Sequence, residues 1–200
     1  MTTDIRYATN DSDLRELNEN VDSINTNNLK QVYIRTSEFE ISSAITRPAN
    51  VTPYVPNEII NGDGLTTLPV LDFSVLGDVA GRAIQINSIS LISSNGGATI
   101  KLNPIVHLYN DATITGQVLS DATAFNPSYS ETLFKKAVTF ESLITIVVQG
   151  TNCYEILQSE ILRNCILSPT STLYVAIIAG NAYIPASAEN ISITVKGYLL

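Results

Sequence analysis

The chain has 200 residues and a net charge of −8. This length suits one sizeable domain with an appendage, and such a domain can bury a hydrophobic core without disulfides or metals. Binding to nucleic acid requires lysines and arginines along a phosphate track, but the eleven basic residues are scattered, with only Lys135 and Lys136 adjacent. The composition therefore argues against direct nucleic-acid binding.

Charged residues make up only 15% of the chain, well below the roughly 25% of a typical soluble protein. Serine, threonine and asparagine supply the polarity instead, with 57 residues in total. A surface of uncharged hydrogen-bonding groups costs less to desolvate than a charged one, and interface cores are likewise depleted in lysine, glutamate and aspartate. The composition favours a subunit packed in an assembly, and it fits an ordinary β-sandwich with threonine-rich strands equally well.

The first residues lack the basic and apolar regions of a secretory signal peptide, and the longest apolar runs are far too short to span a bilayer. We therefore expect synthesis in a host cytoplasm and no contact with a membrane. Without an export route, the two cysteines, Cys153 and Cys165, are expected as free thiols rather than as a disulfide.

Residues 1–31 differ from the rest of the chain because their apolar residues recur at helical spacing. The apolar stripe is as narrow as a coiled-coil seam, although two heptads are too few to hold helices together alone. We predict an N-terminal helical arm that associates with sister arms, or that packs on its own or a neighbouring subunit. The predicted interface residues of its seam are Leu14, Leu17, Val21, Ile24 and Asn28.

From residue 32 the hydrophobic period changes to two, so residues 32–200 are predicted to form a β domain. Many short strands, regular turn signals and no alternation of strands with helices predict an all-β fold, an antiparallel β-sandwich or jelly roll. Tyr154–Arg163 admits either a short helix or a strand. A first strand is expected from Val32 to Arg47, with a bulge or bend near residues 35–38. In the last strand, Ile191, Ile193 and Val195 alternate with polar residues, which predicts one wet face. Strands are expected further at Leu68–Val75, Ala83–Ser93, Ala98–Leu102, Pro104–Tyr109, Ala137–Phe140, Leu143–Gln149, Leu173–Ala179 and Ile191–Lys196.

Three local patterns make sharper predictions. In Ala83–Ser93, strict alternation puts Ile84 and Ile86 on one face but Ile89 and Leu91 on the other, which predicts a bulge or corner. Asn95-Gly96-Gly97 is the clearest hairpin signal, so the next residues are expected to pair back. Leu143–Gln149 is apolar on both faces, which predicts a central strand.

Few residues in the sequence indicate catalysis or cofactor binding. His107, the single histidine, is expected as a hydrogen-bonded structural residue on a strand face. One histidine and two cysteines are a poor ligand set for zinc, and no nucleophile elbow of the Gly-x-Ser-x-Gly type occurs. Asp63, Asp111 and Asp121 lie in predicted loops, where a calcium ion is a minor alternative. We expect no catalytic residue, metal or cofactor, and no enzyme activity.

Pro104–Phe125 combines a strand that ends in an aromatic, a loop, and Asp-x-x-x-Phe at Asp121–Phe125. Together with Thr52–Ile60, Leu173–Ile178 and the segment from Ala182 to the last strand, this layout resembles β-sandwich structural proteins of tailed-bacteriophage virions. The resemblance covers roughly residues 50–200; Tyr109 stands where a phenylalanine is more usual. It implies a non-enzymatic virion component, of the head decoration, cement or head-fibre-base type.

The residues and the resemblance together give the functional hypothesis of a capsid-decorating or cementing subunit in the virion. Its expected partners are itself, as a homotrimer, and the major capsid protein or another virion protein. A neck, tail or baseplate subunit is an alternative within the same class. An alternative of another class is a carbohydrate- or receptor-binding module of a fibre, with Tyr33, Tyr54, Tyr129 and Tyr183 as candidate aromatic contacts.

Overall fold

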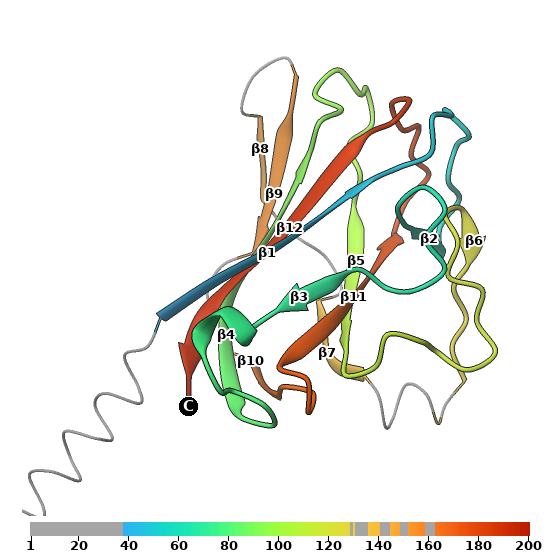
Figure 1. Ribbon diagram of the computed structural model, residues 1–200. Helices are drawn as coiled ribbons and strands as arrows, with labels where there is room; N and C mark the ends of the chain where they lie inside the picture. Colours follow the sequence, from blue (N-terminus) through green and yellow to red (C-terminus); the bar gives the residue numbers. More distant parts are fainter. Residues whose placement is uncertain (1–37, 129, 131–135, 141–144, 149–151, 159–162) are drawn as a thin grey trace, which may run out of the picture. The chain divides into compact units, whose positions relative to one another are not determined.

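The computed structural model describes residues 38–128, 130, 136–140, 145–148, 152–158 and 163–200. The predicted arm and its seam lie outside these residues, as do Tyr33 and Tyr129. Among the described residues, the elements are twelve strands and one short 3-10 turn, η1 (Ser74–Leu76). The strands form two antiparallel sheets (Figure 1). The all-β prediction is therefore confirmed for the described part of the chain.

The first sheet has the order β1-β12-β4-β9-β8, with β10 pairing β4 alongside β9. Two of its long strands, β1 and β12, pair over nine residues without a break in register. Both the first and the last strand of the described domain therefore lie in this sheet. The strand bounds are β1 Glu38–Thr46, β4 Ala83–Ser93, β8 Thr145–Val148, β9 Tyr154–Gln158, β10 Arg163–Ile166 and β12 Asn190–Leu199.

The second sheet has the order β6-β2-β11-β5-β7, with β3 pairing β11 beside β2. β11 is its centre, bonded to β5 on one side and to β2 and β3 on the other. The strand bounds are β2 Glu58–Ile60, β3 Val70–Asp72, β5 Pro104–Tyr109, β6 Thr123–Ala124, β7 Lys136–Phe140 and β11 Thr172–Ala179.

One hydrophobic core joins the two sheets, because period-two alternation sends every second side chain of each sheet inwards. In β12, Ile191, Ile193 and Val195 are buried, whereas the residues between them face outwards as the sequence predicted. Val106 and Leu108 of β5 belong to the same buried cluster as residues of β1, β4 and β12. Two sheets that share such a core form a β-sandwich.

The phase change in β4 corresponds to a bulge. Lys196 of β12 pairs with Ser88 and the next residue, Gly197, pairs with Ile86, so Asn87 is the extra residue on β4. The extra residue shifts the inward and outward alternation of the side chains by one position in the second half of β4. As a result Ile84, Ile86, Ile89 and Leu91 all face the core and are all fully buried. The predicted bulge is confirmed, and the four side chains share one face instead of two.

Gly197 is needed where β12 crosses this bulge. A Cβ at position 197 would lie 1.9 Å from the carbonyl oxygen of Gln85 and 2.9 Å from the Phe39 ring. We therefore expect Gly197→Ala to lower the free energy of unfolding by about 3 kcal/mol, because the backbone of β4 has to move. Denaturant unfolding measures this, with Gly97→Ala as control since no atom lies within 4 Å of that Cβ position. Equal stability of the two variants would contradict the close approach.

The outer face of the second sheet is covered by the chain itself. The segment between β5 and β6 folds over β5 and β11 and buries a second, smaller hydrophobic cluster that includes Ile114, Leu119 and Phe125. Tyr109 is fully buried there, on the face of β5 opposite to Val106 and Leu108. The stretch Pro104–Phe125 is therefore a strand together with its own cover.

The structure contradicts two predictions made from the sequence and decides a third that was left open. Asn95-Gly96-Gly97 forms a turn, but the chain then runs to β5 in the other sheet, so the hairpin prediction is wrong. Among the described strands, β8 lies at the end of its sheet, which contradicts the prediction of a central strand at 143–149. The ambiguous segment after Tyr154 begins with a strand, β9, because β4 offers it a pairing edge.

Candidate functional site

Three segments that are far apart in the sequence meet at one end of the sandwich, which we call the loop end: residues 47–57, 94–103 and 180–189. Tyr54 and Tyr183 form an isolated antiparallel bridge, and their rings stack with centroids 6.4 Å apart. Asn181 accepts a hydrogen bond from the backbone of Asn103 and donates to the carbonyl of Lys101. These bonds fix loops that connect different sheets.

A buried ion pair lies beneath this end. The Arg47 guanidinium donates from Nη2 to the Asp121 carboxylate at 2.8 Å and from Nε to the Tyr54 hydroxyl, and it also stacks over the Tyr54 ring. The Tyr54 hydroxyl and the backbone N–H of Asn61 both donate to the Asp121 carboxylate. Arg47 Nη1 is buried without a hydrogen-bond partner. Burial lowers the pKa of Arg47, but Asp121 and Tyr54 outweigh this, so the pKa is raised and the charge is retained.

A buried carboxylate, Glu189, organises the neighbouring loops. It is 1% exposed and accepts hydrogen bonds from Ser93 at 2.5 Å, from the Tyr183 hydroxyl at 2.7 and 2.8 Å, and from the amide of Ala186. Asn95 in turn donates to the Tyr183 hydroxyl. Burial raises the pKa of Tyr183, so the phenol stays protonated and keeps donating. Together with the ion pair, this network makes the loop end rigid.

The outer face of the first sheet is the other notable surface, and we call it the open face. Six of its side chains carry hydroxyl groups, because Ser and Thr occupy many outward positions of β1, β4 and β12, and four are charged. It is lined by Glu38, Glu40, Ser42, Ala44, Ser88, Ser90, Ile92, Glu155, Leu157, Ser192, Thr194, Lys196 and Tyr198. In the described residues, no second hydrophobic cluster covers it, in contrast to the outer face of the second sheet.

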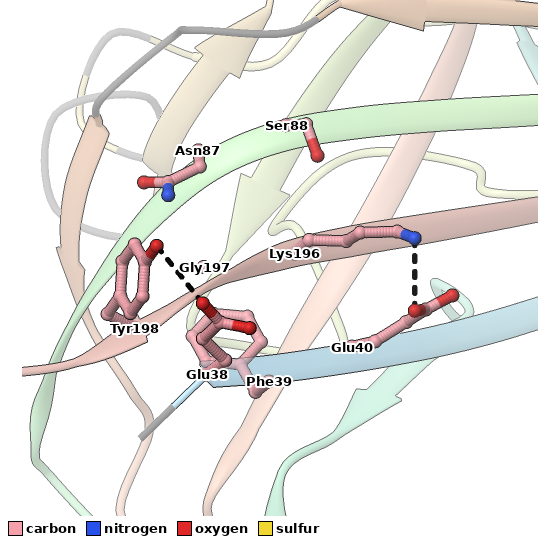
Figure 2. Close-up of a pocket in the computed structure, with 8 residues that line it drawn as sticks. All are labelled: Glu38, Phe39, Glu40, Asn87, Ser88, Lys196, Gly197 and Tyr198. Atoms are coloured by element: carbon pink, nitrogen blue, oxygen red, sulfur yellow. Dashed lines mark hydrogen bonds and ion pairs between the residues drawn. The ribbon is translucent and has the colours of Figure 1, made fainter. Parts of the chain in front are cut away.

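A groove of about 480 Å³ crosses one end of the open face at the bulge of β4 (Figure 2). Tyr198 lies at one end and donates to Glu38 at 3.3 Å, while Lys196 pairs with Glu40 at 3.0 Å. Asn87, the bulge residue, lines the same groove. A second groove of about 340 Å³ adjoins it, sharing the side chains of Glu40 and Lys196. The open face thus carries two adjoining grooves that both polar and apolar side chains line.

The described residues include His107 and the three aspartates that the sequence analysis considered. His107 lies among Tyr109 and Phe125, with its Nδ1 3.3 Å from the Tyr109 hydroxyl, as a structural histidine would. No group of three or more histidine, cysteine or acidic side chains there is placed to hold a metal ion. Of the three aspartates considered for calcium, Asp121 is engaged by Arg47.

The Cys165 thiol is expected to be unreactive. It is buried, and burial raises its pKa from about 9 to about 12. At pH 8 the thiolate, which is the form that reacts, is therefore scarce, and alkylation should be at least tenfold slower than after denaturation. Mass spectrometry after iodoacetamide treatment at pH 8 and pH 9.5 measures this. A thiol that alkylates equally fast in native and denatured protein would contradict the burial. No disulfide joins Cys165 to Cys153.

Of the four tyrosines considered for sugar binding, the structure describes two, and both are unsuitable. Tyr54 and Tyr183 are 0% and 1% exposed, and they support the loop end from within. Tyr198, which the sequence analysis did not select, is the tyrosine that lines a groove. Arg47 and Glu189 were also missed. Their only sequence signal is that they are charged residues flanking predicted strands, which is too common to indicate burial.

No protein-family model matches the sequence, and no curated protein matches it either. Among solved structures, the chain is similar to PRD1 vertex protein P5, with 12% identity and a TM-score of 0.30 over 80% of this chain and 97% of that chain. It is also similar to a chain in the structure of black queen cell virus, with 11% identity and a TM-score of 0.28 over 84% and 73%. Both names are viral, and neither is of a tailed phage.

Among the described residues, no helix combines the length and the apolar character that spanning a bilayer requires.

Proposed function

We propose that this chain is a non-enzymatic structural subunit of a virus particle, which decorates or cements the protein shell. Its partners would be further copies of the chain and the major capsid protein or another virion protein. It would act by burying surface against its neighbours, with the sandwich as a rigid body. The observation that carries the proposal is the strand order.

The strand order supports a jelly roll. If β1, β2, β4, β5, β7, β9, β11 and β12 are numbered one to eight along the chain, one sheet has the order 1-8-3-6 and the other 2-7-4-5. Two-sheet jelly rolls recur in viral capsid domains, and also in lectins and cupins. A fold alone does not decide among these functions, so the surfaces have to be considered as well.

The surfaces favour a structural subunit over an enzyme. The open face presents six hydroxyl-bearing side chains, which cost less to desolvate against another protein than charged groups do, and two of its four charges, Lys196 and Glu40, already form an ion pair. The loop end is held by the buried Arg47 and Glu189 networks, which fix its shape before any contact forms. Pre-formed surfaces of this kind lose little conformational entropy on association.

The test is to find the chain in purified particles. Particles from the culture that carries this sequence are banded in a density gradient, and the fractions are analysed by mass spectrometry and by labelling with an antibody against the full chain. We expect its peptides to band with the particles and the antibody to label their outside. Peptides found only among unassembled proteins at the top of the gradient would exclude the proposal.

Glycan binding is a second candidate, and the groove at Tyr198 is the observation that favours it. An aromatic ring beside the carboxylates of Glu38 and Glu40 offers a stacking surface and acceptors for sugar hydroxyls. A glycan array probed with the full chain should then give binding that Tyr198→Ala abolishes. Tyr174→Ala, on the other sheet and also partly buried, is the matched control. Absence of binding to any glycan would exclude this candidate and leave the structural proposal untouched.

A further inference from the structure

β1 is the long edge strand of the first sheet. Among the described strands it pairs only with β12, whereas the described strand at the opposite edge, β8, has four residues (Figure 1). The nine residues of β1 stay in unbroken register with β12, so the edge is regular from end to end. An edge of this length is a template for pairing with another strand.

β1 carries few of the features by which natural proteins protect such an edge. Those features include prolines, charged side chains (lysines above all), bulges, very short strands and a covering loop or helix. The sequence Glu-Phe-Glu-Ile-Ser-Ser-Ala-Ile-Thr from Glu38 to Thr46 contains no proline and no lysine. Its two charges, Glu38 and Glu40, lie at one end, and its other half is uncharged.

The hydrogen-bond pattern identifies which backbone groups point away from the sheet. Arg47 donates from its backbone N–H to Glu189 on the β12 side, and Thr46 accepts from Asp63 on the other side. Because successive residues alternate in a strand, the backbone groups of Glu38, Glu40, Ser42 and Ala44 point outwards with those of Thr46. The carbonyl of Thr46 is already used, so the open part of the edge ends at Ala44.

We propose that β1 pairs antiparallel with β1 of a second copy of this chain, which joins the first sheets of the two copies into one continuous sheet. In the register centred on Ile41, Glu40 lies opposite Ser42 of the partner and Glu38 lies opposite Ala44. Glu38, Glu40, Ser42 and Ala44 then each exchange both backbone hydrogen bonds with the partner. The ladder needs no hydrogen bond from Thr46.

Charge selects this register over its neighbours. A shift of one pairing step towards the N-terminus sets Glu40 opposite Glu40 of the partner, and like charges directly opposite one another are unfavourable. The opposite shift, centred on Ser42, needs Thr46, whose carbonyl already binds Asp63. In the register centred on Ile41, each carboxylate faces an uncharged side chain. The contact is isologous, since the same four residues supply both sides.

This inference depends on the β1 edge alone, so it holds or fails independently of the virion role. The ladder is a small interface, and we expect reversible, concentration-dependent dimers of the full chain. Sedimentation of the full chain over a range of concentrations measures them. A full chain that stays monomeric up to millimolar concentration would overturn the proposal.

Cysteine cross-linking tests the register. Residues 40 and 42 of opposite copies should lie about 5.5 Å apart between Cα atoms, within disulfide range, whereas like positions should lie about 8 Å apart. A mixture of Glu40→Cys and Ser42→Cys chains should therefore form a disulfide-linked dimer under mild oxidation. Either variant alone, and the unsubstituted chain with its own two cysteines, should not. Cross-linking of Ser42→Cys alone would overturn this register.

Charge substitutions at Ala44 test the same contact without cysteines. Ala44→Glu sets a carboxylate opposite Glu38 of the partner and should weaken the dimer about three- to tenfold, while Ala44→Lys should strengthen it by a similar factor. Ser192→Glu is the control, because Ser192 is the neighbour of Ala44 on β12 and lies one strand inside the edge. If the dimer responds equally to Ala44→Glu and Ser192→Glu, the edge is not the interface.

Ser42→Pro blocks the edge directly. The N–H of residue 42 points away from β12, so a proline there removes an edge donor and leaves the β1–β12 ladder intact. We expect loss of the dimer with retention of cooperative thermal unfolding. A folded Ser42→Pro chain that dimerises like the unsubstituted chain would overturn the proposal, and the Ala44 pair gives the answer if this variant does not fold.

Discussion

Arg47→Ala is expected to lower the free energy of unfolding by about 3–5 kcal/mol, among the largest effects of any single substitution in this domain. The side chain of Arg47 is fully buried and that of Asp121 is 7% exposed. Removal of the guanidinium leaves the Asp121 carboxylate and the Tyr54 hydroxyl in the interior without the cation. An uncompensated buried charge costs more than the pair contributes when it is intact.

Denaturant unfolding of the full chain measures this effect, and the structure offers a matched control. Lys196 and Glu40 form an ion pair at a similar distance, 3.0 Å, but their side chains are 53% and 60% exposed. Lys196→Ala should therefore change the free energy of unfolding by less than about 1 kcal/mol. The double variant Arg47→Met with Asp121→Leu removes both charges together and should recover most of the loss. If Arg47→Ala and Lys196→Ala cost the same, the Arg47 pair is not buried in solution.

The strand pattern of this domain could be predicted from the sequence because it is local. Alternation in β12 identified the strand and its outward face, alternation in β5 identified the strand, and the phase change in β4 predicted the bulge. These signals need only a few neighbouring residues and the geometry of a strand. The all-β class was predicted from the same signals. The described residues agree with it, because they contain no long amphipathic helix.

The loop end could not be predicted, since its contacts are distant in the sequence. Arg47 and Asp121 are separated by 74 residues, and Ser93 and Glu189 by 96. Nothing in the neighbourhood of an arginine or glutamate shows that a fold will bury it against a partner so far along the chain. The failed hairpin has the same origin. The turn at Asn95 formed, but the side chain of Asn95 donates to Tyr183 and to the carbonyl of Ile184.

The sheet order was also beyond local reasoning. Leu143–Gln149 is apolar on both faces, and a local argument assigns such a strand to the middle of a sheet. In the described structure β8 ends the first sheet, after β9. Apolar residues on both faces of a strand indicate that both faces are kept from water, but they do not indicate which element covers each face.

Deletion of Asn87 is expected to abolish folding of the sandwich. The residue adds one position to β4, and that position keeps Ile84 and Ile86 on the same face as Ile89 and Leu91. Without it, strict alternation sends either the first or the second pair to solvent, because a shift of one residue moves every side chain to the other face. Two fully buried aliphatic side chains would be lost from the core, at about 2–5 kcal/mol each.

Such a loss approaches the whole stability of a typical domain, about 5–15 kcal/mol, so the deletion variant should lack a cooperative unfolding transition. Circular dichroism during heating measures it. Deletion of Gly97 is the matched control, because it also removes one residue but lies in an exposed turn between the two sheets. The control should unfold cooperatively. If the Asn87 deletion unfolded as cooperatively as the Gly97 deletion, β4 could regain its register without the bulge, and the extra residue would have no role in keeping its isoleucines in the core.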